Sequence, residues 1–133
     1  MSTIKATNIT DLTGTYTSTT TAINRGIAKA WVNFDGTTAT PSTIRASYNV
    51  SSVTKNGTGD YTVNFTTAMV DTNYSATFGG YNTGVSDGGW ISAYNTGSGS
   101  YPTGVNTGSL RLATYTSAGS PQDQQAVSVA IFR

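Results

Sequence analysis

Aspartate is the only acidic side chain in this sequence of 133 residues, and histidine, cysteine and glutamate are absent. Without histidine or cysteine, the chain lacks the usual base for a serine nucleophile, the thiolate–imidazole pair and imidazole metal ligands. Two aspartates could still serve as the acid and the nucleophile of a glycoside hydrolase. The candidates are Asp11, Asp35, Asp60, Asp71, Asp87 and Asp123.

The sequence around most of these aspartates predicts turn residues. Asp35 and Asp60 adjoin glycines, Asp71 lies in a predicted strand connection, and Asp123 follows a proline. In such places an aspartate is usually solvated and caps its own backbone. We retain only Asp87, in the loop VSDGGW, as a candidate ligand contact. No alternating acidic run gathers the oxygen ligands that calcium needs, so we predict a non-enzymatic protein without metal or cofactor.

A different chemistry is available between residues 79 and 109, where Tyr, Ser, Gly and Asn predominate. This mixture supplies flat amphipathic rings and adaptable hydrogen bonds, as in antibody binding loops. The rings either stack on sugars or a partner surface, or they fold back onto the sheet while the glycines make turns. The candidate receptor- or glycan-binding residues are Tyr81, Asp87, Trp90, Tyr94 and Tyr101.

Strand signals separated by turn signals recur from Ile27 onward, and no segment has convincing helical periodicity. We expect strands in AKAWVNF, Ile44 to Thr54, Tyr61 to Thr67, NYSATFGG, GGWISAYN, SLRLATYT and QQAVSVAIFR. The second and third should form a hairpin with Asn56-Gly57 in its turn, because both residues tolerate positive φ. The sequence therefore predicts an all-β domain over residues 28–133, a sandwich or jelly-roll-like pair of sheets.

Residues 1–27 are rich in threonine and carry few apolar anchors, which indicates an arm, an edge strand or a flexible leader, with an arm preferred. The last predicted strand is apolar on both faces, so it is either central in a sheet or covered by another subunit.

Trp31 breaks the pattern of its strand, because it lies on the polar face opposite Val32 and Phe34. A neighbouring subunit could cover this ring, with Lys29 and Asn33 as a polar rim. The alternative is that a second sheet or the N-terminal arm covers it within one chain. The candidate residues of an oligomer interface are Trp31, Lys29, Asn33 and Phe132.

The charged residues exclude one class of partner. Lys and Arg number 7 and the acidic residues 6, and the basic residues are spread singly, so nucleic-acid binding is not expected. No apolar run approaches the roughly 18 residues of a membrane span. The start MSTIKATNIT lacks the apolar core of a secretory signal. We therefore expect neither membrane insertion nor a signal for export.

Three stretches together resemble a known domain: AKAWVNFDGT, IRASYNVSSVTKNGTGDYTVNFTTAMVDTNYSATF, and SLRLATYTSAG with the closing AVSVAIFR. They are similar, in order, to the C-terminal β-domain of tail fibres and other virion proteins of tailed bacteriophages, including phages of marine and freshwater bacteria such as cyanophages. NGTGDYTVNFTTAM is the most specific run, and the resemblance spans about residues 28–133.

The resemblance implies a non-enzymatic virion protein that is assembled in the host cytoplasm and forms an oligomer, commonly a homotrimer. Its partners would be other virion proteins and a glycan or protein receptor on the host surface. No catalytic residues carry over, because the family pattern has none. No binding residues carry over either, because the loops are where such domains differ. The leading expectation is a tail fibre tip that binds the host receptor. Since only 27 residues precede the domain here, the alternative is a capsid decoration, or cement, protein that stabilises the head shell. A small glycan hydrolase is the third and least favoured.

Overall fold

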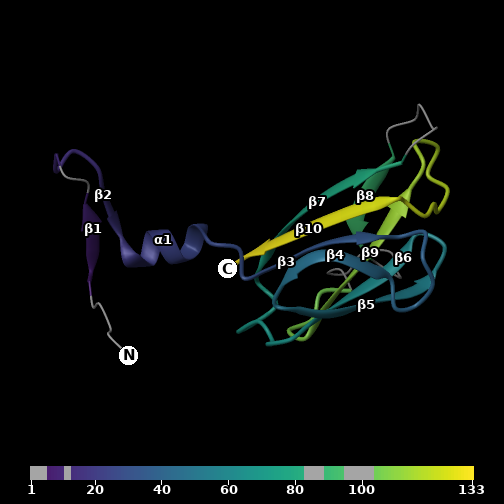
Figure 1. The fold of residues 1–133 in the computed structure, drawn as a ribbon, viewed down its shortest axis with the longest axis horizontal. Coiled ribbons are helices and arrows are strands. Elements are labelled where there is room, and N and C mark those ends of the chain that lie inside the picture. The colour runs from purple at the N-terminus through teal and green to yellow at the C-terminus, as the bar shows by residue number, and fades with distance from the viewer. Residues whose placement is uncertain (1–5, 11–12, 83–88, 95–103) are drawn as a thin grey trace.

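The computed structural model describes residues 6–10, 13–82, 89–94 and 104–133. Within these residues the chain forms a sandwich of two four-stranded antiparallel sheets, and a two-stranded hairpin near the N-terminus (Figure 1). The β10 sheet has the order β4 (Thr43–Tyr48), β3 (Ala30–Asp35), β10 (Ala126–Phe132), β7 (Ser75–Tyr81). The β9 sheet has the order β5 (Val50–Gly57), β6 (Asp60–Phe65), β9 (Ser109–Tyr115), β8 (Trp90–Ala93). The predicted all-β sandwich is confirmed.

The core lies between the two sheets and follows from alternation along their central strands. Every second residue of β3, β6 and β10 is buried, as the two-residue period of a strand requires. The rings of Phe34 and Tyr61 meet edge to face across the core, with centroids 5.2 Å apart. The largest fully buried side chains are Tyr61, Phe34, Leu110, Leu112, Ile131, Val32, Val53, Val63, Val127 and Thr114.

The last strand, β10, is central in its sheet. It pairs with β3 on one side and β7 on the other. Of the two explanations for its apolar character on both faces, the central position is confirmed.

The stretch from Ile44 to Thr54 was wrongly predicted as one strand. It divides at Asn49 into β4 and β5, which belong to different sheets. Asn49 has a φ of 54°, a left-handed conformation that asparagine adopts more readily than most residues. Its side-chain nitrogen donates to the carbonyls of Lys29 and Thr67, each at 3.0 Å, and its oxygen accepts from the Thr67 amide at 2.7 Å. These bonds hold the crossing between the sheets.

The hairpin between β5 and β6 is confirmed, but its turn is not at Asn56-Gly57. Gly57 pairs with Asp60, so Thr58 and Gly59 form the turn, and the register shifts between Lys55 and Gly57. Gly59 has a φ of 66°. A Cβ there would lie 2.4 Å from the Thr114 carbonyl oxygen. Both the positive φ and this lack of space therefore require glycine at position 59.

The N-terminal segment, which we call the arm, precedes the sandwich. β1 (Asn8–Thr10) pairs with β2 (Thr17–Thr19), and the short helix α1 (Thr20–Gly26) follows directly. The Thr19 hydroxyl accepts a hydrogen bond from the Ala22 amide at 3.0 Å and caps this helix, which the sequence did not predict. Figure 1 shows the arm extending away from the sandwich, and no described residue before Ala30 is buried.

The sandwich has an arm end and an opposite end, which we call the distal end. At the arm end, the Lys29 amide donates to the Ile131 carbonyl at 2.7 Å. At the distal end, Tyr81 pairs with Ala126 and Trp90 pairs with Tyr115. Among the described residues, no helix has the length and apolar character to cross a membrane.

Candidate functional site

Two aromatic rings, one exposed and one half-buried, stack at the distal end of the β9 sheet. Trp90 begins β8 and pairs with Tyr115, the last residue of β9. Their neighbours Ile91 and Thr114 point inward, so both rings lie on the outer face. The ring centroids are 4.2 Å apart with 21° between the planes, and Trp90 remains 48% exposed.

A charged pair adjoins this stack on the same face. The Arg111 guanidinium lies over the Tyr94 ring, with Cζ 4.0 Å from the ring centroid. Arg111 also donates from Nε and Nη2 to the two carboxylate oxygens of Asp60, at 2.8 and 2.5 Å. This bidentate geometry fixes both groups. The distal aromatic site, as we name it, consists of Trp90, Tyr94, Tyr115, Arg111 and Asp60.

Both members of the pair are charged at neutral pH. Burial alone would raise the pKa of Asp60, but hydrogen bonds from Arg111 and Asn56 outweigh it and hold that pKa below its usual value. The hydrogen bond to Asp60 raises the pKa of Arg111. A fixed acceptor and a fixed donor therefore stand side by side next to the rings.

A hollow of about 200 Å³ opens beside the charged pair. It lies where the β5–β6 turn, β9 and the segment before β10 meet. Its lining is Gly57, Thr58, Gly59, Asp60, Tyr94, Ala113, Tyr115 and Pro121. It is smaller than the roughly 300 Å³ at which ordinary small-molecule pockets begin.

This arrangement matches the chemistry of a saccharide. The C–H face of a sugar ring packs on an aromatic ring, while its hydroxyl groups donate to a carboxylate and accept from a guanidinium. The described residues contain no group of three acidic side chains that could hold a metal ion.

Comparisons with known proteins bear on the fold. No protein-family model matches the chain, and no curated protein matches it. One solved structure that matches is the crystal structure of the phiAB6 tailspike in complex with three-repeated oligosaccharides of Acinetobacter baumannii surface polysaccharide. The TM-score is 0.52, the identity is 17%, and the match covers 94% of this chain. The fold is similar to that of part of a phage tailspike. The chain spans only 22% of that tailspike chain.

The structure brings together two of the five predicted glycan-binding residues. Trp90 and Tyr94 share the outer face of the β9 sheet. Tyr81 is 61% exposed but ends β7, in the other sheet. Asp87 and Tyr101 lie outside the described residues. Of the two alternatives for these rings, the described part shows a mixture: Trp90 and Tyr94 pack on their own sheet, yet Trp90 keeps an exposed face.

The predicted interface residues lie on or beside the β10 sheet. Trp31 is on its outer face and 39% exposed, so neither the second sheet nor the arm covers it fully. The Lys29 ammonium is turned toward α1, and Asn33 donates to the Ser128 hydroxyl at 2.7 Å. Phe132 is half-buried at the end of β10.

Sequence reasoning missed Tyr115, Arg111 and Asp60. All three lie in strands that were predicted correctly or nearly so, but their meeting depends on the registers of β8 and β6 against β9. The alternation of SLRLATYT puts Arg111 and Tyr115 on one face, which was the only local signal available.

The predicted role of the turn aspartates is half correct. Asp35 accepts from the Thr37 amide at 3.0 Å and Asp71 from the Asn73 amide at 2.8 Å, so both cap local backbone. Asp60 and Asp123 do not. Asp60 pairs with Arg111, and Asp123 accepts hydrogen bonds from residues far away in sequence.

Proposed function

We propose that this chain is a non-enzymatic, tail-associated component of a bacteriophage particle that contacts a host-surface saccharide through the distal aromatic site. The observation that carries the proposal is the exposed Trp90 ring, stacked on Tyr115 next to the Arg111–Asp60 pair. The fold likeness to a tailspike solved with bound oligosaccharides supports it. The resemblance of NGTGDYTVNFTTAM to tail-fibre domains points the same way.

The placement of the arm and the distal aromatic site at opposite ends of the sandwich fits this role. The arm leaves one end of the sandwich (Figure 1), and Trp90 and Tyr115 pair with each other at the distal end. In the proposed arrangement the arm faces the particle and the distal aromatic site faces the cell. Several copies on one particle would combine weak individual contacts into firm attachment.

The electrostatics support a binding role over a hydrolytic one. A glycosidase needs a carboxylic acid whose pKa is raised, so that it can protonate the leaving oxygen. The four described aspartates all have a lowered pKa, because hydrogen bonds and cations stabilise their ionised form. None of them is suited to be the acid.

The proposal is tested with an array of bacterial capsular and O-antigen polysaccharides probed with the purified chain. We expect binding to a subset of them. Trp90→Ala should weaken that binding about tenfold or more, because a lost stacking contact of roughly 1.4 kcal/mol is a factor of ten. Trp90→Phe should retain most of it, because an aromatic face remains.

Tyr16→Ala is the matched control, since it removes an exposed ring that lies in the arm and outside the distal aromatic site. Circular dichroism would verify that each variant is folded. Equal loss of binding in Trp90→Ala and Tyr16→Ala, or no binding to any polysaccharide, would contradict the proposal. The number of copies per particle separates a tail component, present in a few to a few dozen, from a head-decorating protein, present in hundreds.

A further inference from the structure

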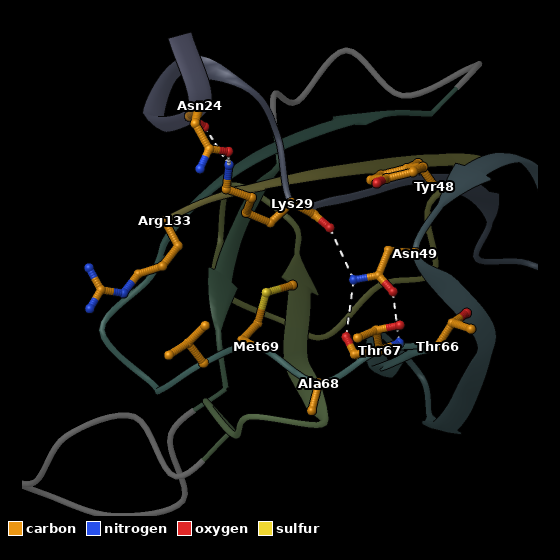
Figure 2. Close-up of a pocket in the computed structure, with 10 residues that line it drawn as sticks. Asn24, Lys29, Tyr48, Asn49, Thr66, Thr67, Ala68, Met69 and Arg133 are labelled. Carbon is orange, nitrogen blue, oxygen red and sulfur yellow. Dashed lines mark hydrogen bonds between the residues drawn. The ribbon is translucent and has the colours of Figure 1, made fainter. Parts of the chain in front are cut away.

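A larger pocket lies at the arm end of the sandwich (Figure 2), and it shares no lining residue with the hollow of the distal aromatic site. Its volume is about 580 Å³, well within the range of ligand pockets, which runs from roughly 300 to 1,000 Å³. We call it the arm-side pocket. It is lined by Asn24, Lys29, Tyr48, Asn49, Thr66, Thr67, Ala68, Met69, Val70 and Arg133.

The framework of this pocket is fixed in advance. As Figure 2 shows, the Asn49 carboxamide bridges Lys29 and Thr67. The Thr66 amide adds a hydrogen bond to the Asn49 carbonyl at 3.2 Å. The start of β3, the β4–β5 crossing and the segment after β6 are therefore tied together, and a ligand need not order them.

Lys29 brings a charge that no acid in the described chain neutralises. The aspartates that the structure describes are each paired with another cation, in the ion pairs Asp35–Arg45, Asp60–Arg111, Asp71–Arg133 and Asp123–Lys55. The Lys29 ammonium instead donates to the Asn24 carbonyl and, at 2.6 Å, to Asn24 Oδ1. Both oxygens are neutral, so the ammonium is held against Asn24 at the edge of the pocket, and within the described residues it has no carboxylate as an ion-pair partner.

Part of the remaining lining is apolar or aromatic. Met69 is buried, Val70 is 92% exposed at the rim, and the Tyr48 ring is 58% exposed. The hydroxyl groups of Thr66 and Thr67 stand beside these surfaces. Arg133 also lines the pocket, but its guanidinium is paired with Asp71. The pocket thus combines one cation without a carboxylate partner among the described residues, one flat ring and short hydroxyl side chains.

We propose that the arm-side pocket binds an acidic sugar unit, a saccharide ring that bears a carboxylate. The carboxylate pairs with Lys29, the C–H face of the ring packs on Tyr48, and the sugar hydroxyls bond to Thr66 and Thr67. A neutral sugar would leave the Lys29 charge without a partner. A small inorganic anion would make no contact with the apolar surface of Met69 and Val70. The arm-side pocket is separate from the distal aromatic site, so this proposal can be tested independently of the function proposed above.

The test is a titration of the full chain with glucuronic acid, followed by the amide signals in ¹H–¹⁵N NMR spectra. We expect saturable shifts at Lys29, Asn49 and Thr66 to Val70, weakened by added salt. Glucose, the matched neutral sugar, should bind at least about tenfold more weakly, the loss expected for one charge-assisted hydrogen bond.

Lys29→Met removes the charge and should weaken glucuronic acid binding about tenfold. Arg25→Met is its control, since it removes one positive charge from the last turn of α1 without touching the pocket lining. Because Lys29 also bonds to α1, Tyr48→Ala provides a second variant, which alters only a largely exposed ring. It should weaken the binding of the sugar and leave the fold unchanged.

Four results would overturn the inference. They are no saturable shifts with glucuronic acid, equal affinity for glucose, displacement by inorganic phosphate at equal concentration, and equal losses in Lys29→Met and Arg25→Met. Trp90→Ala should leave glucuronic acid binding intact, which keeps this test distinct from that of the distal aromatic site.

Discussion

The carboxylate of Asp123 joins separate parts of the sandwich. Its Oδ2 accepts from the Lys55 ammonium at 2.6 Å, and its Oδ1 accepts from the Gly59 amide at 2.8 Å and the Tyr61 hydroxyl at 2.7 Å. Burial raises its pKa, but these hydrogen bonds outweigh burial and hold the pKa below the usual value. The charged form is therefore the one that stabilises the fold.

We predict that Asp123→Asn lowers the free energy of unfolding at pH 7 by about 1–3 kcal/mol, the usual range for a half-buried charged hydrogen bond. A carboxylate with a depressed folded pKa contributes stability above its unfolded pKa of about 3.9 and loses it as pH falls through the folded pKa. The destabilisation by Asp123→Asn should therefore shrink below about pH 4. Urea unfolding of both proteins between pH 2 and pH 7 measures it.

Asp71→Asn is the control, because the Asp71–Arg133 pair lies on the surface. Exposed ion pairs contribute little, so this variant should unfold close to the wild type at pH 7. Two results would refute a stabilising role for the charged Asp123 carboxylate. One is a larger loss of unfolding free energy in Asp71→Asn than in Asp123→Asn. The other is a loss in Asp123→Asn that does not depend on pH.

The sequence correctly predicted a backbone-capping role for those aspartates whose hydrogen-bond partners are near in the chain. Asp35 and Asp71 bond to amides two residues away, and a local turn pattern contains that information. Asp123 and Tyr61 are 62 positions apart, and Arg111 and Asp60 are 51 apart. Such pairs form only after the strands align, so no local pattern distinguishes them from solvated turn residues.

Among the elements, the arm differs most from the rest of the chain. A lone two-stranded hairpin is at best marginally stable, and a helix of seven residues is too short to be stable alone. All buried residues of the sandwich lie at or after Ala30. The sandwich therefore does not need the arm for its core, while the arm needs a partner to be stable.

We predict that a chain shortened to residues 28–133 folds and keeps the β signature of the full chain in circular dichroism. Its melting temperature, measured at low protein concentration to suppress association, should stay within about 4 °C of the full chain, equivalent to roughly 1 kcal/mol. An unfolded or strongly destabilised short chain would show instead that the arm supports the sandwich directly.

The strands were predictable because the alternation of apolar and polar residues is visible within each short stretch of sequence, as in β6 and β10. The break at Asn49 and the turn at Gly59 were not. At Asn49, the decisive contacts come from Lys29 and Thr67. At Gly59, they come from Thr114 and Asp123. Both features are set by packing between sheets, which local propensity cannot encode.

At the scale of the whole molecule, the two outer faces differ in character. Each sheet carries an ion pair, Arg111–Asp60 on the β9 sheet and Arg45–Asp35 on the β10 sheet, but the β10 sheet also exposes Trp31 beside small residues. Ala130 pairs with Trp31, and Gly79 pairs with Ser128. Together they line a shallow hollow of about 360 Å³. An exposed tryptophan next to a hollow lined by small side chains is typical of the centre of a protein–protein interface.

We predict that the chain associates through this face, as a homotrimer according to its resemblance to tail-fibre domains. Light scattering should give three times the mass of one chain, and the melting temperature should rise with protein concentration, because association stabilises only the folded state. Trp31→Ser should shift the mass toward the monomer and remove the concentration dependence. Tyr81→Ser, which removes a more exposed ring from the distal end of the same sheet, should do neither. A wild-type chain that is monomeric, with a melting temperature independent of concentration, would leave Trp31 a solvent-exposed ring and rule out the interface.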